Sequence, residues 1–194
     1  MKPALRALAL AATVTVSACA TTLTSSYQFA ENPLSGAVKE RGRTAKLYYQ
    51  IDTIAVMDAI LFDMGARREW VEQEAAAKRL SAGEKTALIE EQEKDYAANV
   101  TFFLALYTTD EDWNDLVKKD TRWAVFMDTP GGPVRPVSLE SADVEKLPVR
   151  DNLYFNPAFR KFYKVKFPKD KAGAPPHTLF VSSQLGEMKF EWGK

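Results

Sequence analysis

Cysteine and histidine are almost absent from this chain, and each absence excludes a class of chemistry. The 194 residues contain one cysteine, Cys19, and one histidine, His177. A single cysteine forms no intramolecular disulfide and supplies no cysteine-based zinc or iron–sulfur site. A single histidine removes most histidine-metal and histidine-triad chemistry. A domain of this length can still fold without disulfides, because its core is large enough.

The chain also has no excess of charge of either sign. Lysine and arginine together number 26, and so do aspartate and glutamate. Neither sign forms a run long enough to act as a charged tail. We therefore expect no nucleic-acid partner. Hydrophobic residues make up 46% and charged residues 27% of the chain, a mixture typical of a globular protein.

The first residues have the layout of a secretory signal peptide. Lys2 and Arg6 form a short basic start, and the uncharged stretch ALALAATVTV (7–16) follows. Small residues then precede Cys19, as a signal-peptide cleavage region requires. The apolar stretch would extend about 15 Å as a helix, roughly half of a bilayer core. It is therefore too short to span a membrane.

The four residues VSAC, Val16–Cys19, resemble the lipobox of bacterial lipoproteins. The resemblance implies cleavage before Cys19, diacylglyceryl transfer to its thiol and acylation of the new amino terminus. Several acyl chains make a stable membrane anchor where one alone is marginal. Ala20, rather than aspartate, implies sorting to the outer membrane, facing the periplasm, with the inner membrane as the alternative. The other interpretation is an ordinary signal peptide with an incidental cysteine.

We expect three regions in the chain: a signal peptide at 1–18, a tether at 19–43 and a single domain at 44–194. The tether mixes Thr, Ser, Pro and Gly with isolated apolar residues. About 24 flexible residues would span on the order of 25–30 Å. A first strand or short helix near Tyr27–Phe29 is the alternative for part of it.

Residues 45–62 fit either a helix or a strand. Ile51, Ile54 and Leu61 can share a helical face, whereas Ile54, Val56 and Ile60 share strand parity. Because β-branched residues are frequent here, we expect one long strand.

The following residues, about 63–97, predict an antiparallel helical hairpin. Asp63 is placed to cap the first helix. SAGE, Ser81–Glu84, has the spacing of a capping box and would open the second helix. The residues available for the buried side of the first helix are Ala66, Trp70, Ala77 and Leu80.

From about 98 to 194 the hydrophobic period becomes two, which predicts a β-rich body. TFFLALY predicts a strand buried on both faces, and RWAVFM leads to the turn signal DTPGGP. Trp123 would anchor the core from an interior strand. VRPVSL predicts an edge strand, because Pro136 cannot donate a ladder hydrogen bond. HTLFVSS and EMKFEW predict a terminal hairpin. The expected apolar face of FRKFYKVKF comprises Phe159, Tyr163, Val165 and Phe167.

These elements predict an α+β fold: a signal peptide and tether, a helical hairpin and an immunoglobulin-like antiparallel β-sandwich. The organisation is similar to that of uncharacterised proteobacterial outer-membrane lipoproteins, which have a β-rich body after a helical segment. That similarity implies no active residues.

The sequence predicts no catalytic residue, no cofactor and no metal site. An unperturbed histidine titrates near neutral pH, which would suit His177 to act as a general base, but no nucleophile motif accompanies it, so it is more simply the first residue of a strand. The acidic stretch TTDEDWNDL fails the EF-hand pattern, because Asp115 stands where glycine is needed. We expect Asp110 to begin a turn or cap a short helix near Trp113.

The loop RDNLYFNPAF contains a candidate partner surface at Tyr154 and Phe155. If exposed, these aromatic residues could bind an envelope protein. The alternative is that they fold back and close one end of the sandwich.

We therefore expect a lipid-anchored envelope protein that binds or scaffolds without catalysis, with its partner and oligomeric state open. The alternative is an envelope hydrolase or carbohydrate-active protein that uses carboxylates and tyrosines. A deep cleft lined by two close carboxylates would favour the alternative. A convex surface with an exposed aromatic patch would favour the binding protein.

Overall fold

The computed structural model describes residues 40–150, 153 and 156–193. The chain divides into two units, Met1–Ala30 and Glu31–Lys194, and every described residue belongs to the second.

Several sequence predictions lie outside the described residues. They are the signal peptide, Cys19, most of the tether, and the candidate surface at Tyr154 and Phe155. The end of the predicted tether was wrong by two residues, because Gly42 and Arg43 already belong to the first strand.

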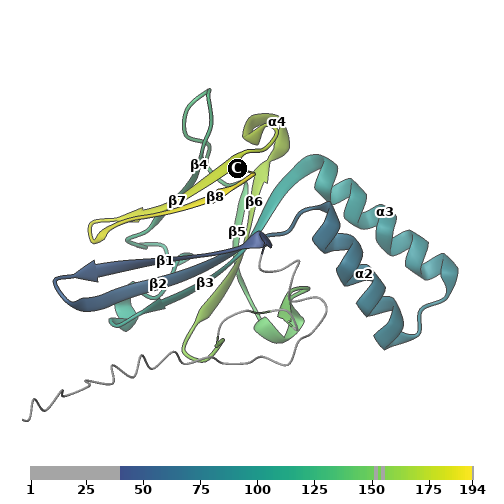
Figure 1. Cartoon of the computed structure of the whole chain (residues 1–194), viewed down its shortest axis with the longest axis horizontal. Coiled ribbons are helices and arrows are strands. Elements are labelled where there is room, and N and C mark those ends of the chain that lie inside the picture. The colour runs from purple at the N-terminus through teal and green to yellow at the C-terminus, as the bar shows by residue number, and fades with distance from the viewer. Residues whose placement is uncertain (1–39, 151–152, 154–155, 194) are drawn as a thin grey trace, which may run out of the picture. The chain divides into compact units, whose positions relative to one another are not determined.

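The described residues form two antiparallel sheets, as the predicted α+β class and sandwich-like arrangement require (Figure 1). Sheet A has the strand order β1-β2-β3-β6-β5, and sheet B has the order β4-β7-β8. The strands of sheet A are β1 Gly42–Tyr49, β2 Asp52–Leu61, β3 Asn99–Thr108, β6 Lys161–Pro168 and β5 Ser138–Ala142. Those of sheet B are β4 Ala124–Asp128, β7 His177–Ser183 and β8 Gly186–Trp192.

The main core lies between the two sheets. It joins the inward faces of β2, β3 and β6 to those of β4, β7 and β8, and includes Met57, Phe102, Tyr163, Val181 and Phe190. Apolar side chains on one face of each strand therefore drive the two sheets together.

A second, smaller core covers the opposite face of sheet A. Ile60, Phe103 and Phe162 pack there against Leu147 and Val149. β3 is thus buried on both faces, as its uninterrupted apolar sequence predicted. The helices are α2 Met64–Lys78, α3 Ala82–Ala98 and α4 Lys169–Ala172, with short 3-10 turns η1 Glu111–Trp113 and η2 Val144–Lys146.

Residues 45–62 form two strands rather than the single long strand that we expected. β1 and β2 pair as a hairpin, and a β-bulge shifts their register between Leu47 and Tyr48. Gln50 and Ile51 make the turn, with Gln50 in the left-handed region at φ 55°. The prediction missed this turn because such positions favour glycine and asparagine, which are absent here.

The helical hairpin begins where its predicted caps are. The Asp63 carboxylate accepts a hydrogen bond from the Ala66 amide, and Ser81 and Glu84 form the reciprocal capping box. The predicted buried side was only partly right. Ala66 and Trp70 are half-buried, but Ala77 is exposed. The end of α2 that contains Ala77 projects away from the sheets (Figure 1).

The deepest residue of α2 is a charged one, Arg67, which is 1% exposed. Its guanidinium donates to the Phe62 carbonyl at 3.2 Å and to Thr101 Oγ1 at 2.9 Å. It also forms an ion pair of 2.7 Å with Asp95 of α3. Arg67 therefore joins both helices to β3, and its buried charge is matched by hydrogen bonds and a counter-charge.

Asp95 completes this junction from the other side. Its second oxygen accepts a hydrogen bond of 2.6 Å from Lys166 of β6. Burial alone would raise the pKa of Asp95, but the hydrogen bonds from Lys166 and Arg67 outweigh burial and hold that pKa below its ordinary value.

Three details of the β-body differ from the predictions. Trp123 is buried but precedes β4, an edge strand of sheet B, so it does not lie on an interior strand. The predicted edge strand begins at Ser138, after Pro136, because proline interrupts the ladder. Phe159 is 86% exposed and precedes β6, so it does not share the apolar face of that strand.

Candidate functional site

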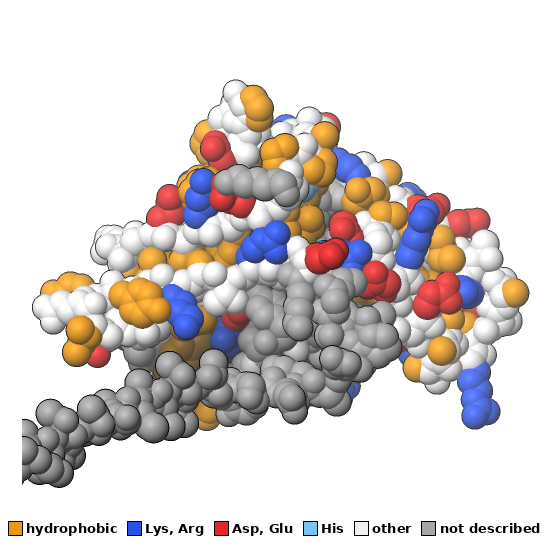
Figure 2. All heavy atoms as spheres, viewed as in Figure 1, with side chains coloured by type: hydrophobic (Ala, Val, Ile, Leu, Met, Phe, Trp, Pro, Cys, Tyr) orange, Lys and Arg blue, Asp and Glu red, His pale blue; other side chains and the backbone are white. Residues whose placement is uncertain are grey.

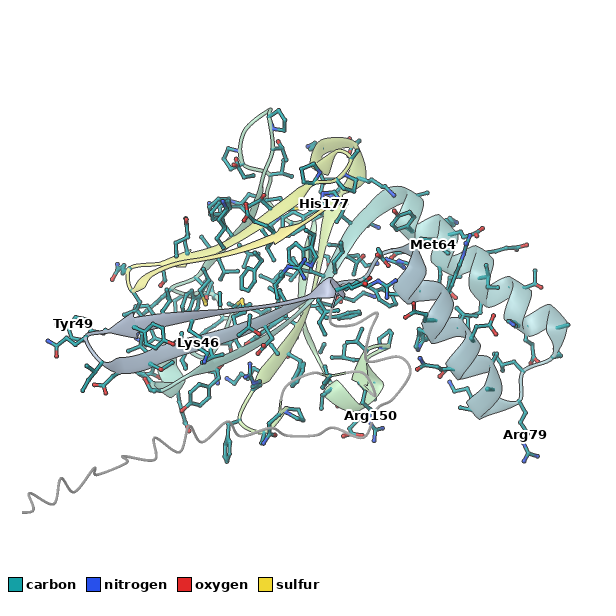
Figure 3. The ribbon with its side chains drawn as sticks, in the orientation of Figure 1. Lys46, Tyr49, Met64, Arg79, Arg150 and His177 are labelled. Carbon is teal, nitrogen blue, oxygen red and sulfur yellow. The ribbon has the colours of Figure 1, made fainter. Side chains whose placement is uncertain are left out.

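An open pocket of about 430 Å³ lies between α2 and the segment that contains η2. α2 contributes Trp70, Gln73, Glu74, Ala77 and Lys78 to its wall, and the other side is formed by Glu145, Lys146, Leu147, Pro148 and Arg150. Figure 3 shows Arg150 on the segment that faces α2. The pocket thus has one indole ring and both signs of charge in its wall.

The two carboxylates of the pocket each have a cation beside them. Glu74 is paired with Lys78 one turn further along α2. Glu145 forms an ion pair with Arg150, with 2.7 Å between Glu145 Oε2 and Arg150 Nη1. Each carboxylate in the pocket wall therefore has its counter-charge on a neighbouring residue of the same segment.

Gln73 supplies a polar group that the fold leaves without a partner. Its amide nitrogen is shielded from solvent and has no hydrogen-bond partner among the described residues. Buried amide donors are normally satisfied, and an exception calls for a specific explanation. Because the nitrogen itself is shielded, a ligand carbonyl would reach this donor only after the Gln73 side chain turns into the pocket.

Sequence reasoning did not find this pocket. Trp70 was predicted as part of the buried side of the first helix, and Gln73, Glu74 and Lys78 read as ordinary solvated helix surface. The opposite wall comes from a segment about 75 residues later in the chain. No local pattern signals that these two segments meet.

His177 is the first residue of β7, as predicted, and it is also buried. Burial lowers the pKa of His177, and nearby Lys169 lowers that pKa further. Its Nδ1 atom has no hydrogen-bond partner within the described part of the chain. Its environment therefore favours the neutral imidazole.

The acidic stretch around Asp110 is used for capping. The Asp110 carboxylate accepts a hydrogen bond of 2.9 Å from the Asp112 amide at the start of η1, as predicted. The Asp115 carboxylate accepts from the amides of Val117 and Lys118. No group of three or more metal-ligating side chains is found among the residues that the structure describes.

A buried ion pair lies on the outer face of sheet A. Asp58 of β2 is 1% exposed and pairs with Arg160, which immediately precedes β6. Thr44 of β1 donates a hydrogen bond to the same carboxylate. No local pattern in the sequence predicts this pair, because 102 residues separate its partners.

Tyr163 belongs to the main core, as its predicted place on the apolar face of the strand requires. Burial raises the pKa of Tyr163 to about 12, and its hydroxyl accepts a hydrogen bond of 3.2 Å from the Leu116 amide. A phenol with so high a pKa stays protonated at neutral pH, and this one is placed for packing.

Within the described residues, no helix is both long and apolar enough to cross a membrane. Comparisons of the chain with models of protein families, with curated proteins and with solved structures find no match.

Proposed function

We propose that this chain is a lipid-anchored protein of the cell envelope that binds a segment of a partner protein without catalysing a reaction. The VSAC motif supports the anchor at Cys19, the outer-membrane location and the periplasmic orientation. The pocket between α2 and η2 supports the binding role.

The observation that carries the binding role is the state of the polar groups in the pocket. Glu74 and Glu145 are each ion-paired, while the Gln73 amide nitrogen has no hydrogen-bond partner among the described residues. A wall with ion-paired carboxylates and a glutamine amide suits a peptide backbone, whose carbonyls accept hydrogen bonds. Trp70 adds an apolar surface with a hydrogen-bond donor, a side chain that recurs at protein interfaces.

The same proposal includes an immunoglobulin-like class for the sandwich. Two facing antiparallel sheets with a shared core support that class. Such sandwiches present loops at the ends of their strands, where binding surfaces are readily built.

Photo-crosslinking in intact cells tests the proposed binding. A photoreactive amino acid at Ala77, in the pocket wall, should yield adducts with envelope proteins. The matched control is Ala87, which is exposed on α3 and outside the pocket wall. Equal adducts at both positions, or adducts only with cytoplasmic proteins, would contradict the proposal.

The anchor needs a separate test. Cys19→Ser should abolish lipid attachment and leave an unprocessed or soluble protein, as measured by mass and by membrane fractionation. Normal processing and membrane retention of this variant would remove the anchor from the proposal.

An envelope hydrolase is the alternative, and it rests on the two glutamates that line one pocket. A hydrolase of this kind would lose activity on isolated cell-wall material when Glu74→Gln or Glu145→Gln is introduced. The binding proposal expects no such activity in the unsubstituted protein.

A further inference from the structure

The end of the β1–β2 hairpin carries large apolar side chains that the fold does not use. Tyr48, Tyr49 and Ile51 are 58%, 68% and 94% exposed. No described residue forms a hydrogen bond, ion pair or ring contact with these three side chains. Figure 3 shows Tyr49 at the far end of the hairpin, and Figure 2 shows hydrophobic side chains gathered there.

Turn geometry does not explain these residues. A two-residue hairpin turn favours Asn, Asp and Gly, and their polar or absent side chains also suit exposure to water. Ile51 instead places a branched aliphatic side chain at a turn position where it is 94% exposed. Its exposure removes any packing role within the described domain.

A neighbouring turn extends the same apolar surface. Leu185 lies in the turn between β7 and β8 and is 38% exposed. This turn lies beside β1, since a Cβ atom on Gly186 would be 3.3 Å from Leu47 Cδ2. Both turns lie at the same end of the two sheets in Figure 1. We call Tyr48, Tyr49, Ile51 and Leu185 the apolar tip.

We propose that the apolar tip inserts into the interfacial region of the membrane that holds the lipid anchor. Tyr48 and Tyr49 are consecutive strand residues, so their side chains point to opposite faces of the hairpin, and Ile51 extends from its end. A protein partner would cover one face of so narrow a projection. A lipid interface surrounds both faces and the end together.

The side chains of the tip suit that environment. Tyrosine places its ring among apolar groups and its hydroxyl in the polar layer, and it is enriched where membranes meet water. Lys46 lies two residues before Tyr48 and is exposed, so its ammonium can reach lipid phosphates while its stem lies along the apolar surface.

The tip alone is a small apolar surface, and its role rests on the proposed anchor at Cys19. A tether keeps the tip at high local concentration near the membrane, so a weak contact becomes effective. β1 is about 26 Å long. The 20 residues at 20–39 could reach about 70 Å when extended. The anchor and the tip can therefore occupy the same membrane surface.

Depth-dependent quenching tests the proposal. Ile51→Cys is introduced in the full chain, so that lipidation of Cys19 leaves one free thiol for an environment-sensitive fluorophore. The lipidated protein is placed in vesicles of phosphatidylethanolamine and phosphatidylglycerol that carry nitroxide-labelled lipid. We expect a blue shift and quenching at position 51, and loss of both when Tyr48→Ser and Tyr49→Ser are added.

The matched control is Arg79→Cys, at the end of the helical hairpin, where we expect neither shift nor quenching. An unquenched label at position 51 in lipidated protein overturns the proposal. Protection of that label from a water-soluble quencher only when envelope proteins are added would also overturn it, in favour of a protein partner.

A second measurement separates this proposal from the anchor. The Cys19→Ser chain expressed without residues 1–18 should bind the same vesicles weakly at high lipid concentration, and Ile51→Asn should lower its partition coefficient by about tenfold, as expected for one isoleucine side chain. Equal vesicle binding with and without Ile51→Asn would contradict the proposed insertion of the apolar tip. A mature protein whose mass shows no lipid refutes the anchor, whatever the tip does.

Discussion

Two hairpins extend from the sheets of this protein, and their ends differ in chemistry (Figure 3). The α2–α3 hairpin ends in Lys78, Arg79 and Ser81, the N-cap of α3, and all three are exposed and polar. The β1–β2 hairpin ends in Tyr48, Tyr49 and Ile51, which are exposed and largely apolar. Both ends lie in solvent in the described structure, so exposure alone does not account for the difference.

The bases of the two hairpins show the opposite contrast. The helical hairpin is held by a buried arginine, Arg67, and its ion pair with Asp95. The β1–β2 hairpin rests on apolar packing of Ala55, Met57 and Ala59 in the main core. Polar groups thus stabilise the base of the helical hairpin and solvate its end, whereas the β1–β2 hairpin contributes apolar residues both to the main core and to its exposed end.

The largest effect is expected at the base of the helical hairpin. Arg67→Met removes a charge whose partners Asp95 and Thr101 remain, and should lower the free energy of unfolding by about 3 kcal/mol in a denaturant titration. Arg68→Met, next to it but 66% exposed, should change that free energy by less than about 0.5 kcal/mol. Similar losses in both variants would show that burial of Arg67 does not matter.

The capping box should have a smaller effect, at the end of the same hairpin. Ser81→Ala removes the acceptor for the Glu84 amide, and the expected loss is about 1 kcal/mol. Hydrogen exchange should rise chiefly in the first turn of α3. Ser183→Ala, on β7, is the control for loss of a serine elsewhere and should leave α3 exchange unchanged.

Acid should weaken the junction that Asp95 forms at the foot of the helical hairpin. The folded pKa of Asp95 lies below its ordinary value of 3.8, so the unfolded chain binds this proton more readily. The stabilisation is complete above that ordinary value and is lost as the pH falls through the folded pKa. Asp95→Asn should flatten this part of the stability–pH curve, whereas Glu93→Gln on the exposed side of α3 should not.

The smallest effect is expected at the apolar tip. Ile51→Ser should change the free energy of unfolding by less than about 0.5 kcal/mol, because the side chain is 94% exposed. A thermal melt in the absence of lipid checks this. A clear loss of stability would show that Ile51 supports the fold and would weaken the contrast between the two hairpins.

Local signals predicted the elements that depend on neighbouring residues. Asp63 and the Ser81–Glu84 box marked both helix starts, because caps are decided within four residues. The alternation of apolar and polar residues in HTLFVSS and EMKFEW predicted the terminal hairpin, because the two strands are adjacent in the sequence. The β1–β2 turn was missed because Gln50 and Ile51 carry no turn signal.

The features that the sequence could not predict depend on contacts between residues far apart in the chain. Arg67 reads as a surface residue until Thr101 and Asp95 are seen around it. The pocket requires α2 to meet the segment at 145–150, and the Asp58–Arg160 pair joins β2 to the start of β6. Each depends on tertiary placement, which overrides local preference.

The seam between β1 and β8 has a consequence for the order of folding. The Arg41 carbonyl accepts a hydrogen bond of 2.6 Å from Trp192 Nε1, and Arg43 Nε donates to the Glu191 carbonyl. The first pair is 151 residues apart, whereas Arg67 and Thr101 are 34 apart. Contacts distant in sequence form late, since they close the longest loops. The contact between Arg67 and Thr101 can therefore form before the C-terminal strands are available, but the seam must wait for β8.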